Sequence, residues 1–150
     1  MPREKEFSSN EVLIQAADLF TRHGYAGTSM SMLTEELGVA KQSLYNAFGD
    51  KEALYLQSLQ ALINDSPLVR AIQVRLGVER TGRVRIADFF SVVLSECTHP
   101  DHPGCMVSAG LLEMQQDSLL GQQLQARWHA STEMLRSAVE DGQRDGAGPE

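Results

Sequence analysis

Apolar residues along this chain recur at intervals of three and four positions, the spacing that places them on one face of an α-helix. Alternating β-branched runs, which are typical of strands, are nearly absent. The first helix is predicted to begin at Ser8, because Ser8 and Glu11 have the S-x-x-E spacing of a capping box. It is predicted to end at Gly24, since glycine readily adopts the positive φ found after many helices. The pattern predicts an all-α fold.

Two short helices are predicted between Thr28 and Phe48, with a turn at Gly38 between them. Their apolar stripes consist of Met30, Leu33 and Leu37 in the first helix and Leu44, Ala47 and Phe48 in the second. Isolated helices of this length are marginal in water, so both must pack against the first helix. A helix, a short helix, a glycine turn and a second short helix form the arrangement of a helix-turn-helix motif.

Further helical patterns follow this three-helix head. Asp50 is predicted to cap a helix that runs through Ile63, and a break is predicted at residues 77–82. Later helices are predicted over residues 84–97, which we expect to be buried, and over 105–114 and 118–141, followed by a loop at 142–150. A boundary is therefore predicted near residues 48–51, between a head of residues 1–50 and a helical region of residues 51–150.

Composition and charge limit the classes of function. The 150 residues carry a net charge of −7, which argues against non-specific coating of nucleic acid and against attraction to an anionic membrane. Residues 1–60 contain five basic and eight acidic side chains, so DNA binding must depend on a local cluster of donors and have a shallow salt dependence. Two cysteines and no long apolar run predict a soluble cytoplasmic protein with reduced thiols.

Polar side chains near the glycine turn suit contact with duplex DNA. The second short helix begins with residues that can donate to base edges, and glutamine can pair with adenine through two hydrogen bonds. Nearby hydroxyls, amides and an ammonium group can contact phosphates. The candidate contacts are Thr28, Ser29, Lys41, Gln42, Ser43, Tyr45, Asn46 and Lys51. The spacing alone leaves open an ordinary α-domain with solvated polar faces.

A longer run of residues resembles a known family. Residues 24–30, Leu33 and residues 38–54, with the pattern L-Y-x-x-F-x-x-K-E-x-L, resemble the DNA-binding head of TetR/AcrR-type repressors, and the resemblance extends over residues 9–56. It implies that Thr28, Tyr45 and Lys51 clamp phosphates and that Lys41, Gln42 and Ser43 read bases. Asn46 stands where the family often has an aromatic residue or histidine, and Ala40 replaces the usual serine N-cap.

The resemblance also implies a function for the whole chain. Residues 1–50 would be the helix-turn-helix DNA-binding domain, and residues 51–150 a ligand-binding and dimerisation domain. A homodimer would repress transcription from a palindromic operator until a small-molecule effector releases it. Members of the family usually continue with two more helices that form the dimer interface. This chain therefore resembles a C-terminally shortened member, either a natural short form or a fragment, in which residues 118–141 or exposed apolar surface would form the dimer.

Apolar side chains in the second region are candidates for effector contact. They allow an apolar or aromatic effector, with His129 as a polar partner. The candidate lining residues are Phe89, Phe90, Val93, Leu111, Met114, Trp128 and Met134. An ordinary hydrophobic core is the alternative for each of them. No cofactor is predicted, and an enzyme is not expected, because no Ser/His/Asp arrangement or phosphate-cradling glycine loop stands out.

The segment from Cys97 to Cys105 has three interpretations. With His99 and His102 the cysteines form a C-x-H-x2-H-x2-C array of zinc-binding residue types, although the spacing is tight and no metal is predicted. Cys105 near a helix start could instead be a reactive thiol resolved by Cys97. The favoured interpretation is a packing role with Cys105 buried. A thiol- or metal-responsive sensor of the same fold, without dimeric DNA binding, is the alternative function.

Overall fold

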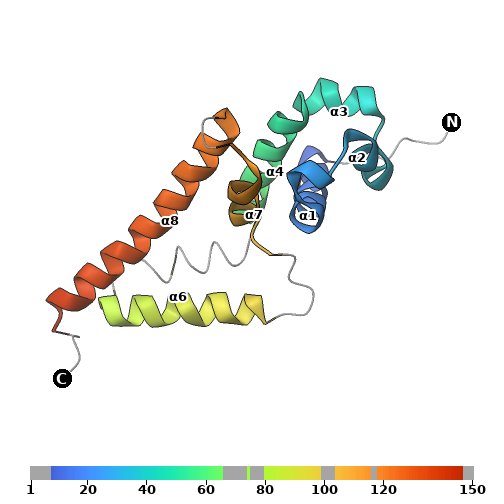
Figure 1. The fold of residues 1–150 in the computed structure, drawn as a ribbon. Coiled ribbons are helices and arrows are strands. Elements are labelled where there is room, and N and C mark those ends of the chain that lie inside the picture. Colours follow the sequence, from blue (N-terminus) through green and yellow to red (C-terminus); the bar gives the residue numbers. More distant parts are fainter. Residues whose placement is uncertain (1–7, 66–73, 75–79, 99–103, 116–117, 147–150) are drawn as a thin grey trace.

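The computed structural model describes residues 8–65, 74, 80–98, 104–115 and 118–146, and in these residues the secondary structure is helical without strands. Figure 1 shows a group of helices formed by the first half of the chain, with α6 and α8 extending away from it. The all-α prediction is confirmed. The helices are α1 (Ser9–Gly27), α2 (Met30–Leu37), α3 (Lys41–Phe48), α4 (Lys51–Asp65), α6 (Gly82–Cys97), α7 (Met106–Glu113) and α8 (Leu119–Arg144).

Helix α1 begins as predicted and bends at the residue where its end is predicted. The Ser8 hydroxyl accepts from the Glu11 amide at 3.2 Å, and the Glu11 carboxylate accepts from the Ser8 amide at 3.2 Å. Gly24 has φ 75 and ψ 171, so it interrupts the helical geometry. One further turn follows it and runs to Gly27. The glycine therefore makes a kink, and the predicted end at Gly24 is three residues early.

The three head helices share a core with α4, α7 and the start of α8. Its fully or nearly buried members are Val12, Ala16, Ala17, Phe20, Leu33, Leu37, Leu44, Phe48, Leu54, Tyr55, Leu59, Met106, Leu120 and Leu124. Ala47 is exposed, which corrects its predicted place in the apolar stripe of α3. The Asp50 carboxylate accepts from the Ala53 amide at 2.8 Å and caps α4 as predicted. Since α4 supplies core residues to the head, the two predicted regions share one hydrophobic core.

Helices α6 and α8 cross closely because glycines meet at the crossing. A Cβ atom at Gly82 would overlap the amide nitrogen of Gly142 and the carbonyl oxygen of Ala138. Beside the crossing, the Arg85 guanidinium is buried and pairs with the Asp141 carboxylate at 2.5 Å. These contacts hold the start of α6 against the end of α8, as Figure 1 shows.

Two predictions for this region need correction. Helix α6 is predicted to be buried, but Val84, Phe90 and Leu94 are exposed along one side of it. Only the opposite side packs, through residues such as Arg85 and Val92. Helix α8 continues to Arg144, three residues beyond its predicted end. The predicted break at residues 77–82 lies mostly outside the described residues. Within the described part of the chain, no helix has the length and apolar character needed to cross a membrane.

Tyr55 links α4 to α7 in the centre of this core. Its side chain is 1% exposed, and its hydroxyl donates to the Met106 carbonyl at 2.8 Å. Its ring packs edge-on against Phe20 and Tyr25, with centroid distances of 4.9 and 5.3 Å. Burial, and secondarily the Glu113 carboxylate, raises the pKa of Tyr55 above the ordinary 10.0. The folded chain therefore favours the neutral hydroxyl.

We expect Tyr55→Phe to lower the free energy of unfolding by about 1 kcal/mol at neutral pH, since it removes one buried hydrogen bond and keeps the ring. In the unchanged protein, the stabilisation due to the raised pKa of Tyr55 is complete below pH 10.0 and is lost as the pH rises toward the folded-state value. Tyr55→Phe lacks this titrating group, so its free energy of unfolding should fall less between neutral and alkaline pH. Burial also raises the pKa of Tyr25, so both proteins keep the alkaline loss that is due to Tyr25. Urea unfolding of both proteins at neutral and alkaline pH measures this, and equal alkaline losses would contradict it.

Candidate nucleic-acid interface

Helix α3 presents a polar face at the edge of the molecule. Leu44 and Phe48, one turn apart, bury one side of the helix against the core. The opposite side is exposed, and Figure 1 shows α3 at the end of the molecule away from α6. Its exposed polar residues are Lys41, Gln42, Ser43, Tyr45 and Asn46. The structure therefore brings the predicted base-reading residues together on one accessible surface.

The first turn of α3 lacks a side-chain cap. Ala40 occupies the N-cap position, and no side chain there accepts from the first amides of the helix. Such a cap is worth about 1 kcal/mol, so α3 depends on packing of Leu44 and Phe48 for its stability. The uncapped amides also leave hydrogen-bond donors at the helix start, where an anion such as a phosphate is favoured.

Two amide side chains on α3 are joined by a hydrogen bond. The Gln42 Nε2 donates to Asn46 Oδ1 at 2.9 Å, across one helical turn. This bond leaves Gln42 Oε1 and its second N–H proton free for a base edge, the pair that adenine requires. Asn46 thus holds the Gln42 amide in place. The sequence analysis did not identify this pair, although its i, i+4 spacing is a signal that could have indicated it.

Ser29, at the start of α2, and Tyr45, in α3, both carry exposed hydroxyl groups. Ser29 is the N-cap of α2, and its oxygen accepts from the Met32 amide at 3.1 Å. Its hydroxyl proton remains available to donate to a phosphate. Tyr45 is 39% exposed, which leaves its ring partly packed and its side chain accessible from solvent. Both positions are compatible with the predicted phosphate contacts.

Thr28 lies in a different environment from the one predicted. Its side chain is 0% exposed, and its hydroxyl donates to the Gly24 carbonyl at 2.6 Å. A buried hydroxyl needs an internal partner, and the Gly24 carbonyl supplies it here. The phosphate contact of Thr28 stays a prediction.

Lys51 is also held inside the head. Its ammonium donates to the Tyr25 carbonyl at 2.7 Å and to the Thr28 carbonyl at 3.0 Å, and it lies 4.1 Å from the centroid of the Tyr25 ring. An ammonium group has three donors, so two are already used within the chain. Lys51 therefore fixes the position of neighbouring backbone and retains one donor for a phosphate.

Charge around the polar face of α3 is sparse. Lys41 is the one charged residue in the sequence of α3. Exposed Glu35 and Glu36 lie at the end of α2, and Asp50 follows α3. Acidic side chains near the face oppose the approach of a polyanion, so hydrogen bonds rather than long-range attraction must supply the selectivity.

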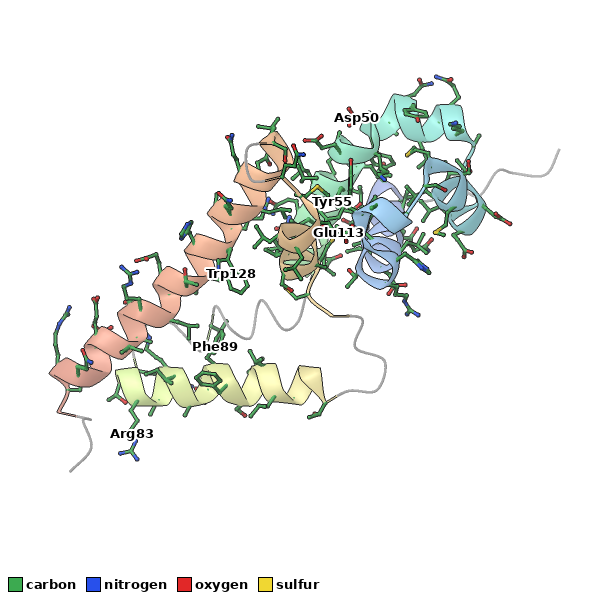
Figure 2. All side chains as sticks on the ribbon, viewed as in Figure 1. Asp50, Tyr55, Arg83, Phe89, Glu113 and Trp128 are labelled. Atoms are coloured by element: carbon green, nitrogen blue, oxygen red, sulfur yellow. The ribbon has the colours of Figure 1, made fainter. Side chains whose placement is uncertain are left out.

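The candidate effector-contact residues lie in two places. Leu111 and Met114 are half-buried and pack against the core of the head and α4. Phe89 and Phe90 form an edge-to-face pair on α6 with a centroid distance of 5.5 Å, and Figure 2 shows Phe89 on α6 and Trp128 on α8. Phe90 and Trp128 are about half exposed, whereas Val93 and Met134 are half-buried and His129 is exposed. Effector contact by these residues remains a prediction.

The cysteine and histidine segment is described only in part. Cys105 is a free, exposed thiol at the N-cap of α7, so its predicted burial is wrong. Cys97 ends α6, and its side chain lies outside the described residues, as do His99 and His102. No group of three or more His, Cys, Asp or Glu side chains that could hold a metal occurs in the described ranges.

One contact to the head was not predicted from the sequence. The Glu113 carboxylate at the end of α7 accepts from the amides of Tyr25 at 3.2 Å and Ala26 at 2.8 Å. The partners are 88 and 87 positions apart in the sequence, so no local pattern marks this contact. It joins α7 directly to the last turn of α1.

Comparison with known proteins agrees with this arrangement. Residues 12–57 match the family model for bacterial regulatory proteins of the tetR family. The chain is 33% identical over 101 residues to the uncharacterized HTH-type transcriptional regulator YezE of Bacillus subtilis (strain 168), covering 67% of this chain and 51% of that one. It is 30% identical over 117 residues to the HTH-type transcriptional repressor ComR of Escherichia coli (strain K12), covering 77% and 55%. The chain thus spans about half the length of the curated relatives it matches.

Solved structures extend the similarity over nearly the whole chain. A cysteine mutant of the TetR family transcriptional regulator CifR, in a complex with 26bp double-strand operator DNA, superposes with a TM-score of 0.82 at 28% identity, covering 97% of this chain and 76% of that one. The TetR family transcriptional regulator PfmR from Thermus thermophilus superposes with a TM-score of 0.66 at 25% identity, covering 93% and 74%. With a head that matches the family model and a helical arrangement shared with these regulators, this chain belongs to the TetR family of bacterial regulatory proteins.

Proposed function

We propose that this protein is a DNA-binding transcriptional regulator, a repressor that recognises its operator through α3. The observation that carries the proposal is the exposed polar face of α3, where Lys41, Gln42 and Ser43 occupy the first turn. The N-terminal residues of such a recognition helix contact base edges in the major groove. The similar protein CifR was solved with operator DNA, which supports this assignment.

The roles of individual residues follow from their placement. Gln42, held by Asn46, reads an adenine through two hydrogen bonds, while Lys41 and Ser43 contact neighbouring bases or phosphates. The hydroxyls of Ser29 and Tyr45 donate hydrogen bonds to phosphates on either side of the groove. The Thr28 hydroxyl and two of the three Lys51 ammonium N–H groups donate to backbone carbonyls instead. The interface therefore depends on a few hydrogen bonds and on the exposed cation of Lys41.

We expect Gln42→Ala to weaken binding to the preferred duplex about tenfold or more, and to abolish the preference for adenine at one position, since a bidentate base contact is worth about 1–3 kcal/mol. Fluorescence anisotropy measures the effect, with the duplex that the unchanged protein selects best from a randomised pool. Gln143→Ala, at an exposed position near the end of α8, is the matched control and should bind like the unchanged protein.

Other variants separate base reading from phosphate contact. Tyr45→Phe should weaken binding to all duplexes by the same factor, because phosphate contacts carry no sequence information.

The affinity of the unchanged protein for DNA should fall only slowly as the salt concentration rises, because few phosphates are neutralised. If Gln42→Ala and Tyr45→Phe both bind like the unchanged protein, α3 is not the DNA-reading element. If the unchanged protein selects no duplex from the pool, a sensor without DNA binding becomes the better assignment.

The dimer and the effector are further parts of the proposal. A palindromic operator presents two half-sites about one helical turn apart, so reading it requires two copies of α3. We propose a cytoplasmic homodimer whose affinity for the operator falls when an apolar or aromatic small molecule binds in the region of α6 to α8. Light scattering that finds only monomer at micromolar concentration, with and without operator duplex, would contradict the dimer.

A further inference from the structure

The last turn of α1, which leads into α2, is held by an acidic side chain from α7. Because Gly24 interrupts the helical geometry, the amides of Tyr25 and Ala26 begin a new turn, and the first amides of a helical turn are those that need partners from outside it. The Glu113 carboxylate accepts from both of them, at 3.2 and 2.8 Å. A carboxylate at the start of a helical turn is favoured by the positive end of the backbone dipole. Figure 2 shows Glu113 beside this part of α1.

The same turn is held at its other end by a cation. The Lys51 ammonium donates to the carbonyls of Tyr25 and Thr28, at 2.7 and 3.0 Å. We name residues 25–28, with an anion at their start and a cation at their end, the clamped turn. Both charges have the sign that the backbone dipole favours at that end. The clamped turn is therefore fixed jointly by α7 and by α4.

Gly24 makes room for the Glu113 carboxylate. Its φ of 75 is strained for any residue with a side chain, and a Cβ at this position would overlap Glu113 Oε1. The positive φ favours glycine at this position, and the missing Cβ lets the Glu113 carboxylate approach the kink without having to shift.

The clamped turn sets where the helix-turn-helix begins. Thr28 at its end is buried, with its hydroxyl on the Gly24 carbonyl, and the next residue, Ser29, is the N-cap of α2. A displacement of the turn therefore moves the start of α2 and, through it, α3. At its other end α7 is held by the buried hydrogen bond from Tyr55 to the Met106 carbonyl. Glu113 thus connects α7, which is anchored at its other end, to the turn that precedes α2.

We propose that Glu113 is a positioning residue for DNA binding. Through its contact with the clamped turn, it makes the position of the helix-turn-helix depend on the position of α7. This inference rests on the proposed function. If Glu113 acted on DNA only through its charge, its removal would strengthen DNA binding, because the loss of a negative charge favours binding of a polyanion. A positioning role predicts that the loss of Glu113 weakens binding in spite of the more favourable net charge.

The test compares Glu113→Ala and Glu113→Gln with Glu36→Gln, which removes the same charge from an exposed position on α2. Anisotropy uses the duplex that the unchanged protein selects from a randomised pool. We expect Glu113→Ala to bind at least about fivefold more weakly. Glu113→Gln, which retains one acceptor oxygen, should lie between Glu113→Ala and the unchanged protein, and Glu36→Gln should bind equally well or more tightly.

Amide hydrogen exchange provides a readout that does not need DNA. The amides of Tyr25 and Ala26 should exchange faster in Glu113→Ala, while amides in the middle of α8 keep their protection. Binding by Glu113→Ala as tight as that of Glu36→Gln, or unchanged exchange at Tyr25 and Ala26, would overturn the proposal. If the unchanged protein selects no duplex, the role in DNA binding is overturned together with the proposed function. Faster exchange in Glu113→Ala would then show that the contact itself exists.

Discussion

Leu44→Ala is expected to abolish sequence-specific DNA binding while leaving α6 and α8 folded. Leu44 is 1% exposed and, with Phe48, is one of two side chains that bury α3. Truncation of a buried leucine to alanine costs about 2–5 kcal/mol. An eight-residue helix without an N-cap has little stability of its own, so this loss should open α3 locally.

The experiment separates local opening from global unfolding. Amide exchange should accelerate throughout α3 in Leu44→Ala, while the middle of α8 keeps its protection. Anisotropy with the selected duplex should show binding reduced to the level of an unrelated duplex. Ala47→Ser, at an exposed position of the same helix, is the matched control and should keep its affinity. Normal affinity in Leu44→Ala would show that DNA is read by another element.

Gly82→Ala is expected to give the largest loss of stability in the second half of the chain. The new Cβ would overlap backbone atoms of Ala138 and Gly142, which cannot rotate away as a flexible side chain can. Helix α6 must therefore shift away from α8. The shift also separates Arg85 from Asp141, and an uncompensated buried charge is costly, so we expect a loss of about 3–5 kcal/mol.

Urea unfolding of the full chain measures this loss. Gly27→Ala is the control, because its new Cβ would meet only the Cβ of His23 at 3.8 Å, an ordinary contact. The control should change the free energy of unfolding by less than about 1 kcal/mol. A similar small change in Gly82→Ala would mean that α6 and α8 do not pack as closely as this crossing requires.

Local chemistry explains which parts of the fold were predictable. Ser8 with Glu11 and Asp50 each mark a helix start, because a cap acts within three residues of itself. The apolar stripes of α2 and α3 depend on helical spacing alone, and that spacing identified Leu33, Leu37, Leu44 and Phe48 as buried. The exposed polar side of α3 is the complement of its stripe, so its DNA-contact candidates were predictable as a set.

Burial and partners over long distances were not predictable in this way. Thr28 and Lys51 have residue types that suit phosphate contact, yet the kink at Gly24 turns the Thr28 hydroxyl inward and places carbonyls around the Lys51 ammonium. The exposure of Phe90 depends on which side of α6 packs against the rest of the protein, and the sequence of α6 alone does not determine that side.

The sequence by itself determined the all-α fold, the helix-turn-helix and the identity of the residues on the polar side of α3. Capping and amphipathic spacing act over a few residues, so they are written in short stretches of chain. The tertiary structure decided which hydroxyls and charges remain accessible, how α6 meets α8, and that Glu113 reaches Tyr25 and Ala26. Those contacts arise when helices distant in sequence pack together, and packing depends on the shapes of both surfaces.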